Sequence, residues 1–316
     1  MRRTSGQNLV ENKLISNCKG YTLTSAWNNY YVPDSVADAL AILQRYDGRA
    51  RVVGGGTDLL VESRRGLRRP FEAIVDASRI SGLDSIVEDD GFIVIGCGVT
   101  HTMLINDERI IRSGTCLSES CGVIGGPQVR NTGTLAGNVA HALPAGDGTI
   151  GLLALGGEVE IASTAGSHWM PAKDTFKGPG RSMIDRQREI LTRLRFRPAR
   201  ADEGSAFHRV MRPQGLCLPI ISMAARLQIR DSIVSSAGIS MGPVGPVPWF
   251  AEPVANALIG EPANEERFKR AAEVALDNIS LRTSKYRATE EYRATMIRTY
   301  LPIILATAAE RAGATQ

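Results

Sequence analysis

Residues 128–147 read QVRNTGTLAGNVAHALPAGD, a stretch in which glycine, alanine and small polar residues predominate. Such residues bury little apolar surface, so the segment is either a flexible connection or a backbone that must approach another group closely. Residues Gly133–Gly137 could present a set of backbone amides, and Asn138 could add a side-chain amide. Asp147, at the end of the stretch, could accept hydrogen bonds from ribose hydroxyls.

A second glycine cluster lies upstream, where residues 52–59 read VVGGGTDL at the end of a strand-like run, Arg49–Val53. Consecutive N–H groups without intervening side chains form a nest for phosphate oxygens, and Thr57 adds a hydroxyl donor. The cluster is not a P-loop, because no Lys-Ser/Thr follows its last glycine, and it lacks the third glycine of a Rossmann fingerprint. Taken alone, it is also compatible with a tight turn, and the later stretch with a surface loop. Together, the two loops predict a dinucleotide whose pyrophosphate is held from two sides, without choosing the nucleotide or the reaction.

The composition narrows the class of protein. A chain of 316 residues favours two domains, and 43% apolar with 22% charged residues is typical of a soluble globular protein. Because 37 basic residues nearly balance 33 acidic ones, nothing favours nucleic-acid binding. The longest apolar run, near Leu301–Ala309, is too short to cross a bilayer, and no apolar stretch follows the twin arginine at the start.

Other chemistries have little support in the sequence. The four histidines are far apart without metal-ligand spacing, and no G-x-S-x-G elbow for a serine nucleophile is present. The odd, scattered set of cysteines argues against disulfides and predicts buried free thiols in a cytoplasmic protein. The cysteines are Cys18, Cys97, Cys116, Cys121 and Cys217.

The pattern of the chain indicates how it is divided. Residues 1–26 have no firm periodicity and are interpreted as an extension, and a helix capped by Asp34 or Ser35 follows. Further strands are predicted at Phe71–Asp76, Phe92–Ile95, Val159–Ala162 and Ile190–Phe196. From residue 205, three strand-like runs precede three amphipathic helices, which predicts a separate α+β unit after a boundary at 198–204. The strands are predicted at Phe207–Met211, Leu218–Ile229 and Ile233–Met241, and the helices at Ala251–Ile259, Glu265–Asn278 and Thr289–Arg311.

Arginines gather around residues 186–200 and partly alternate with apolar Leu194 and Phe196. This alternation is typical of a half-exposed strand with one solvated face, and a partner's docking surface is the alternative interpretation.

The glycine loops also resemble two motifs of a known family. VVGGGTDLLVESRRG (residues 52–66) resembles the A-G-G-T-D-L motif of the FAD-binding subunits of molybdenum hydroxylases, among them the medium chain of carbon monoxide dehydrogenase and the flavin segment of xanthine dehydrogenase. The opening stretch resembles that family's V-R-N-x-G-T-I-G-G-N-x-A motif followed by P-x-x-D. Stretches that begin SAFHRVM, ISMGPVG and KYRATEEYR resemble later segments of the family, in the expected order from about residue 27 to 310.

The resemblance implies a fold and a cofactor. It implies a two-lobed FAD-binding domain of the vanillyl-alcohol oxidase (PCMH) type over residues 27–200, and a C-terminal domain of a three-stranded antiparallel sheet with helices over 205–312. The expected FAD contacts carry over residue by residue. The pyrophosphate would be held by Val52, Val53, Gly54, Gly55, Gly56, Thr57, Asp58 and Leu59 from the first loop and by Thr134, Leu135, Ala136, Gly137 and Asn138 from the second. Asp147 would hold the adenosine ribose, whereas Ile124, Leu191 and Arg209 would lie near the isoalloxazine ring.

Five positions depart from the family pattern. Ala136 stands where a glycine is usual, and Gly54 where an alanine is usual. Arg209 replaces a lysine, Phe207 replaces a tyrosine, and Cys217 stands where an aspartate is usual.

The resemblance further implies an electron-transfer subunit with no catalytic residue of its own. A molybdopterin-binding large subunit would oxidise the substrate, and a small subunit with two 2Fe-2S clusters would pass electrons to FAD in this chain. It also implies a dimer of heterotrimers that delivers electrons to NAD, quinone or oxygen. Molybdenum and iron–sulfur groups belong to the partners, because the necessary cysteine clusters are absent here. A self-contained flavoenzyme similar to UDP-N-acetylenolpyruvoylglucosamine reductase, or a scaffold subunit that has lost its flavin, are the alternatives.

Overall fold

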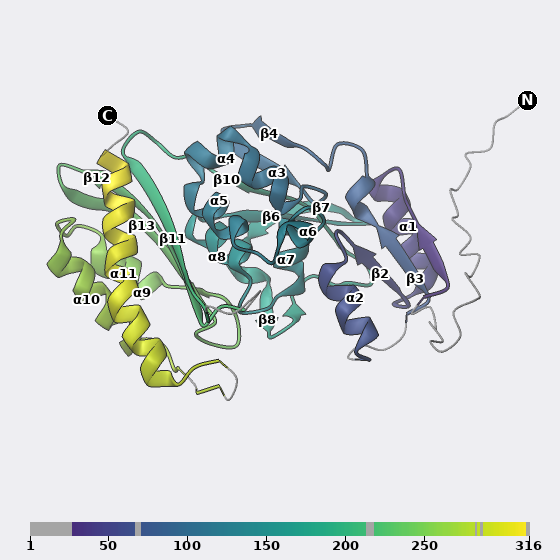
Figure 1. Ribbon diagram of the computed structural model, residues 1–316. Coiled ribbons are helices and arrows are strands. Elements are labelled where there is room, and N and C mark those ends of the chain that lie inside the picture. Colours follow the sequence, from purple (N-terminus) through teal and green to yellow (C-terminus); the bar gives the residue numbers. More distant parts are fainter. Residues whose placement is uncertain (1–26, 67–70, 213–217, 282, 285–286, 314–316) are drawn as a thin grey trace, which may run out of the picture.

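The structure is a computed structural model that describes residues 27–66, 71–212, 218–281, 283–284 and 287–313. The predicted N-terminal extension and two of the cysteines, Cys18 and Cys217, lie outside these residues. Figure 1 shows three regions side by side, a small first lobe, a larger second lobe and a C-terminal unit. Within the described residues, no helix combines the length and apolarity needed to cross a membrane.

The first lobe consists of a three-stranded parallel sheet and two helices. Its strands are ordered β1-β3-β2, with β1 at Asn29–Tyr31, β2 at Ala50–Val53 and β3 at Ala73–Asp76. Helix α1 (Val36–Tyr46) begins at the predicted cap Ser35, whose hydroxyl accepts a hydrogen bond from the amide of Asp38. Helix α2 (Thr57–Arg64) follows β2 directly, so the first glycine cluster is the turn from strand to helix.

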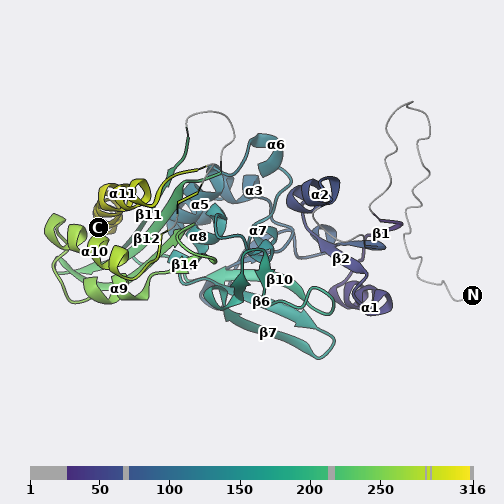
Figure 2. The same ribbon diagram turned by 90° about the horizontal axis from the view of Figure 1, so that it is seen from below.

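The second lobe combines a five-stranded antiparallel sheet with short helices. The strand order is β4-β5-β10-β6-β7, and Figure 2 shows β10, β6 and β7 from below. The strands lie at Ile86–Asp89 (β4), Phe92–Gly96 (β5), Glu158–Ser163 (β6), Gly166–Pro171 (β7) and Ile190–Phe196 (β10), with a small pair at Phe176–Gly178 (β8) and Arg181–Ser182 (β9). The α-helices are α3 (His101–Asn106), α4 (Glu108–Ser113), α5 (Thr115–Gly122), α6 (Pro127–Arg130), α7 (Leu135–His141) and α8 (Asp147–Ala154), and 3-10 turns lie at Ala77–Arg79 and Ala172–Thr175.

Strand β10 is the central strand of this sheet, and its sequence explains its two faces. Leu194 and Phe196 are buried, whereas Arg193 before them is exposed and Arg195 between them is partly exposed, so the predicted half-exposed strand is confirmed. Arg195 lies over the rings of Phe92 and Trp169, 4.1 Å from each ring centroid. These contacts hold the guanidinium against two ring faces, and Glu158 pairs with its charge at 2.6 Å.

The C-terminal unit is an antiparallel sheet in the order β11-β12-β13-β14, covered on one face by helices. The three predicted strands are present as β11 (Glu203–Val210), β12 (Ile221–Arg230) and β13 (Ile233–Gly242), and a two-residue strand β14 (Trp249–Phe250) joins their edge. Helices α9 (Glu252–Leu258), α10 (Glu265–Asp277) and α11 (Glu290–Gly313) complete the unit, and both figures show α11 along the sheet. The α+β class and the three-stranded antiparallel core are therefore confirmed.

The opposite face of this sheet packs closely on the second lobe. Gly238 of β13 lies so near α8 that an added Cβ would be 2.2 Å from the carbonyl oxygen of Ala154. At the neighbouring helix α5, Glu119 accepts hydrogen bonds from the amide of Phe207 (2.8 Å) and from the guanidinium of Arg311 (2.7 Å). This docking brings β11 against the helices of the second lobe, so that Arg209 on β11 faces the space between them.

Candidate functional site

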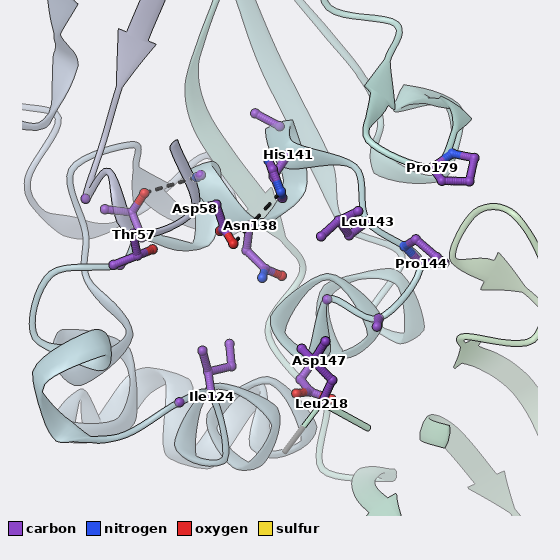
Figure 3. A pocket seen from close by; sticks show the side chains of 18 of the residues that line it. Thr57, Asp58, Ile124, Asn138, His141, Leu143, Pro144, Asp147, Pro179 and Leu218 are labelled. Carbon is purple, nitrogen blue, oxygen red and sulfur yellow. Dashed lines mark hydrogen bonds and ion pairs between the residues drawn. The ribbon is translucent and has the colours of Figure 1, made fainter. Parts of the chain in front are cut away.

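A deep cleft lies where the first lobe, the second lobe and the C-terminal unit meet. Its volume is about 1480 Å³, and Figure 3 shows side chains from several elements around it. Pockets for drug-sized ligands are roughly 300–1,000 Å³, so this cleft has room for a longer molecule such as a dinucleotide. Arginines outnumber acids around it, which favours an anionic ligand. The arginines are Arg51, Arg186, Arg209, Arg212, Arg287 and Arg293, and the acids are Asp58, Glu62, Asp147 and Glu189.

The first glycine loop packs its backbone against the second. A Cβ at Gly55 would lie 1.9 Å from the carbonyl oxygen of Thr132, and a Cβ at Gly54 would lie 2.8 Å from the Thr134 hydroxyl. Gly56 caps α2 with a left-handed φ of 68°, a conformation that other residues rarely adopt. Each of these positions therefore requires glycine for its own local reason. Together the two loops form one wall of the cleft without protruding side chains.

The second loop is the turn that begins α7. Thr134 is its N-cap, and the Thr134 hydroxyl accepts a hydrogen bond from the Gly137 amide at 3.0 Å. The Asn138 amide bonds to the Thr134 carbonyl, and the Asn138 side-chain oxygen accepts from Thr149. The amides of Gly137 and Asn138 are thus used in hydrogen bonds inside the chain.

At the other side of the cleft, an ion pair joins α8 to β11. Arg209 Nη1 lies 3.0 Å from a carboxylate oxygen of Asp147, and the two side chains are 8% and 5% exposed. Arg209 Nη1 also donates to the carbonyl of Val123, the residue before Ile124, and the Ser222 hydroxyl donates to the second carboxylate oxygen. Figure 3 shows Asp147 and Ile124 on the same side of the cleft.

Burial governs the protonation of this pair. Burial raises the pKa of Asp147 to about 6, although the charge of Arg209 and the hydrogen bond from Ser222 act in the opposite direction. Asp147 is thus ionised near neutral pH and titrates in the weakly acidic range. The net charge of the Asp147–Arg209 pair therefore depends on pH.

A cross-lobe contact lies near the first turn of α2. His141 Nε2 at the end of α7 is 3.5 Å from a carboxylate oxygen of Glu62 and 3.9 Å from one of Asp58. Figure 3 shows His141 beside Asp58, with a dashed line joining the two side chains. When His141 carries a proton, it links the first lobe to the second.

Sixteen of the seventeen residues predicted from the sequence line this one cleft. The exception is Leu135, which is fully buried in the main hydrophobic core. Ala136, which stands where a glycine is usual, also packs into that core at 5% exposure, and this explains how its methyl group is accommodated beside the cleft. The sixteen lining residues are Val52, Val53, Gly54, Gly55, Gly56, Thr57, Asp58, Leu59, Ile124, Thr134, Ala136, Gly137, Asn138, Asp147, Leu191 and Arg209.

His101 and Arg293 are two of the several lining residues that sequence reasoning did not assign to the cleft. His101, the first residue of α3, was weighed only as a metal ligand, and no motif marks it as part of the cleft. Arg293 lies in the last predicted helix, yet its guanidinium is buried and donates to the carbonyls of Ile220 and Pro243. Only tertiary packing brings these side chains to the cleft. The three described cysteines are buried and free as predicted, and burial raises their pKa values.

Comparison with known proteins finds a matching protein family for each of the two parts of the chain. Residues 23–198 match the model of the "FAD binding domain in molybdopterin dehydrogenase", and residues 205–308 match the "CO dehydrogenase flavoprotein C-terminal domain". The xanthine dehydrogenase FAD-binding subunit of Escherichia coli O157:H7 is 27% identical, over 90% of this chain and 97% of that one. The carbon monoxide dehydrogenase medium chain of Afipia carboxidovorans is 28% identical, over 90% and 96% of the two chains.

A solved structure agrees with these sequence matches. Carbon monoxide dehydrogenase from Hydrogenophaga pseudoflava superposes with a TM-score of 0.84 and 26% identity, over 89% of this chain and 97% of that one. The likeness extends over nearly the whole of the compared chain rather than one part of it.

Proposed function

Because this chain belongs to the family of FAD-binding subunits of molybdenum hydroxylases, we infer that it is the FAD-carrying electron-transfer subunit of such a complex. The observation that carries the inference is the cleft, in which two glycine loops from different lobes form one backbone wall. Bound FAD would supply electron transfer in steps of one or two electrons, which suits a link between one-electron clusters and a terminal acceptor. The residues of this chain would bind and orient that group, and none would act on the substrate.

The residues of the cleft fit FAD. The close contact of Gly55 with Thr132 leaves backbone and the Thr57 hydroxyl facing the space where a pyrophosphate would lie. The surplus of arginines offsets the two negative charges of that group. Ile124 and Leu191 add apolar surface for a planar ring.

The ion pair between Asp147 and Arg209 refines the expected roles. The adenosine and isoalloxazine parts of FAD lie on opposite sides of its pyrophosphate, whereas Asp147 and Arg209 are in direct contact. The two residues therefore serve the same end of the cofactor. We assign both to the isoalloxazine end, because Arg209 is bonded to the carbonyl beside Ile124. The ribose contact expected of Asp147 then falls to another residue.

We propose that this chain works with partner subunits, since its relatives are named as a subunit or a medium chain of a dehydrogenase. The chain would carry FAD between a small subunit with 2Fe-2S clusters and a terminal acceptor, while a molybdopterin-binding large subunit oxidises the substrate. We further propose that the complex is a dimer of heterotrimers in the cytoplasm. Its electron acceptor would be NAD, quinone or oxygen. We also keep the proposed domains 27–200 and 205–312, because β10 ends at Phe196 and β11 begins at Glu203.

Purification under native conditions tests this proposal. The tagged chain should copurify with two further subunits, and the complex should contain FAD, molybdenum and iron. NADPH-dependent turnover of a small substrate by the isolated chain would instead favour a self-contained reductase, which the match of the C-terminal half to a dehydrogenase flavoprotein domain argues against. A chain recovered without flavin and without partners would contradict the proposal and favour a scaffold.

A further inference from the structure

His101 occupies the junction of the two glycine loops. Its backbone amide donates to the carbonyl of Gly133 at 2.9 Å, which fixes the start of α3 to the second loop. A Cβ at Gly133 would lie 3.4 Å from Cδ2 of the His101 ring and 3.5 Å from the hydroxyl of Thr57. The ring and the Thr57 hydroxyl therefore both lie close to Gly133 of the second loop. His101 is 2% exposed as a residue, and it lines the cleft.

The surroundings of the ring determine which nitrogen carries the proton. Nδ1 is fully buried and has no hydrogen-bond partner within the part of the chain that the structure describes. A proton on Nδ1 would be a buried donor without an acceptor, which is costly, so the proton belongs on Nε2. Burial, with a smaller effect from the charge of Arg130, lowers the pKa of His101 to about 4. The ring is therefore neutral at pH 7 and carries a single N–H group.

Nε2 is the nitrogen that reaches the cleft. It is not among the fully buried polar atoms that lack a partner, and no hydrogen bond to a described residue occupies it. An N–H donor at this position, near Gly133 as the Thr57 hydroxyl also is, suits an anionic oxygen. A packing role alone would place an apolar ring here and would avoid the cost of burying Nδ1 without a partner.

We propose that His101 is a further cofactor-binding residue, which donates a hydrogen bond from Nε2 to a pyrophosphate oxygen of the bound dinucleotide. This inference rests on the proposed function, because it needs FAD in the cleft. It adds a side-chain donor from α3 to the two loops.

Binding of FAD to the full chain freed of its flavin tests the proposal. The His101→Phe variant keeps a ring of similar size but has no donor, whereas His101→Gln places an amide N–H near the position of Nε2. A hydrogen bond to a charged acceptor predicts that His101→Phe binds FAD about tenfold more weakly or worse, and that His101→Gln recovers most of the loss. The control is His168→Phe, on the exposed strand β7 and outside the cleft.

Each outcome of the titration bears on the proposal. Equal binding by wild type and a folded His101→Phe variant would overturn it, as would an equal loss in both variants, which indicates packing alone. Failure of the wild-type chain to bind FAD would contradict the proposed function itself, and this proposal with it.

A measurement on the wild-type chain avoids any folding defect of the variants. Nitrogen-15 NMR of histidine-labelled protein should show the proton on Nε2 of His101, and its resonance should move when FAD is added. The phosphorus-31 resonances of bound FAD should in turn differ between wild type and His101→Gln. A proton on Nδ1, or a His101 signal that FAD leaves unchanged, would overturn the proposal.

Discussion

The guanidinium of Arg209 and the carboxylate of Asp147 lie 3.0 Å apart in the cleft, with both side chains nearly inaccessible to water. The residues are 62 positions apart, on β11 of the C-terminal unit and at the first turn of α8. A negative group at the start of a helix is favourable, and here it also neutralises a cation at the proposed isoalloxazine end. The charge at the proposed isoalloxazine end is therefore set by the second lobe and the C-terminal unit together.

Replacing Asp147 by asparagine should raise the midpoint potential of the bound flavin. At pH 8 the wild-type carboxylate offsets Arg209, and its removal leaves a positive charge that stabilises the reduced flavin. The expected rise is on the order of tens of millivolts. Because the pKa of Asp147 is about 6, the difference from wild type should disappear below that pH. Redox titration followed by absorbance measures it, with Asp202→Asn at an exposed ion pair as the control.

Gly55→Ala should disrupt the wall of the cleft. The new methyl group would overlap the Thr132 carbonyl, so the two loops must separate at a cost of about 1–3 kcal/mol or more. We expect a lower melting temperature and loss of flavin during purification. Gly122→Ala is the matched control, since its methyl group would meet only Ile105 at 4.0 Å. Normal flavin content in Gly55→Ala would show that the loops do not hold the cofactor.

His101→Gln should flatten the pH dependence of stability. The pKa of His101 is lowered from 6.5 to about 4 in the folded chain, so the folded state binds fewer protons than the unfolded state between these values. The free energy of unfolding should therefore fall as the pH decreases through this window. By pH 5 the loss due to His101 is about 2 kcal/mol, and the variant should lack it. Urea unfolding of the flavin-free proteins at pH 8 and pH 5 measures the difference. An equal change in the free energy of unfolding in wild type and variant would refute the depressed pKa.

Glu119→Ala should weaken the docking of the C-terminal unit. The substitution leaves the Phe207 amide and the Arg311 guanidinium without their carboxylate acceptor, at a cost of about 2–3 kcal/mol. Thermal unfolding should show a lower transition temperature or two separate transitions. Glu273→Ala, which removes an exposed pair with Arg298, should cost only about 0–1 kcal/mol. A Glu119 effect no larger than this control would mean that the contact contributes little.

Local patterns predicted the elements that have a clear face or a clear motif. Strand β10 has the predicted bounds because buried Leu194 and Phe196 alternate with arginines along it. The two glycine loops were found because consecutive small residues have few uses other than close backbone approach. The short helices α3 to α8 were harder to predict, since each has only one or two turns and little room for a periodic pattern.

The contacts between distant segments could not be predicted from the sequence. Nothing local indicates that Gly55 packs on Thr132, or that Asp147 pairs with Arg209. Leu135 was assigned with its neighbours in the loop, but its large apolar side chain is in the core. His101 was overlooked because a single histidine in a helix has no motif, and its role depends on the loop beside it.

The flavin content of the chain tests the central claim most directly. The chain should be separated from its partners under mild conditions, and its FAD and polypeptide concentrations should be measured by absorbance after denaturation. The account predicts one FAD per chain, with molybdenum and iron remaining in the partner subunits. A folded chain that contains no FAD and does not take it up when FAD is added would contradict the account.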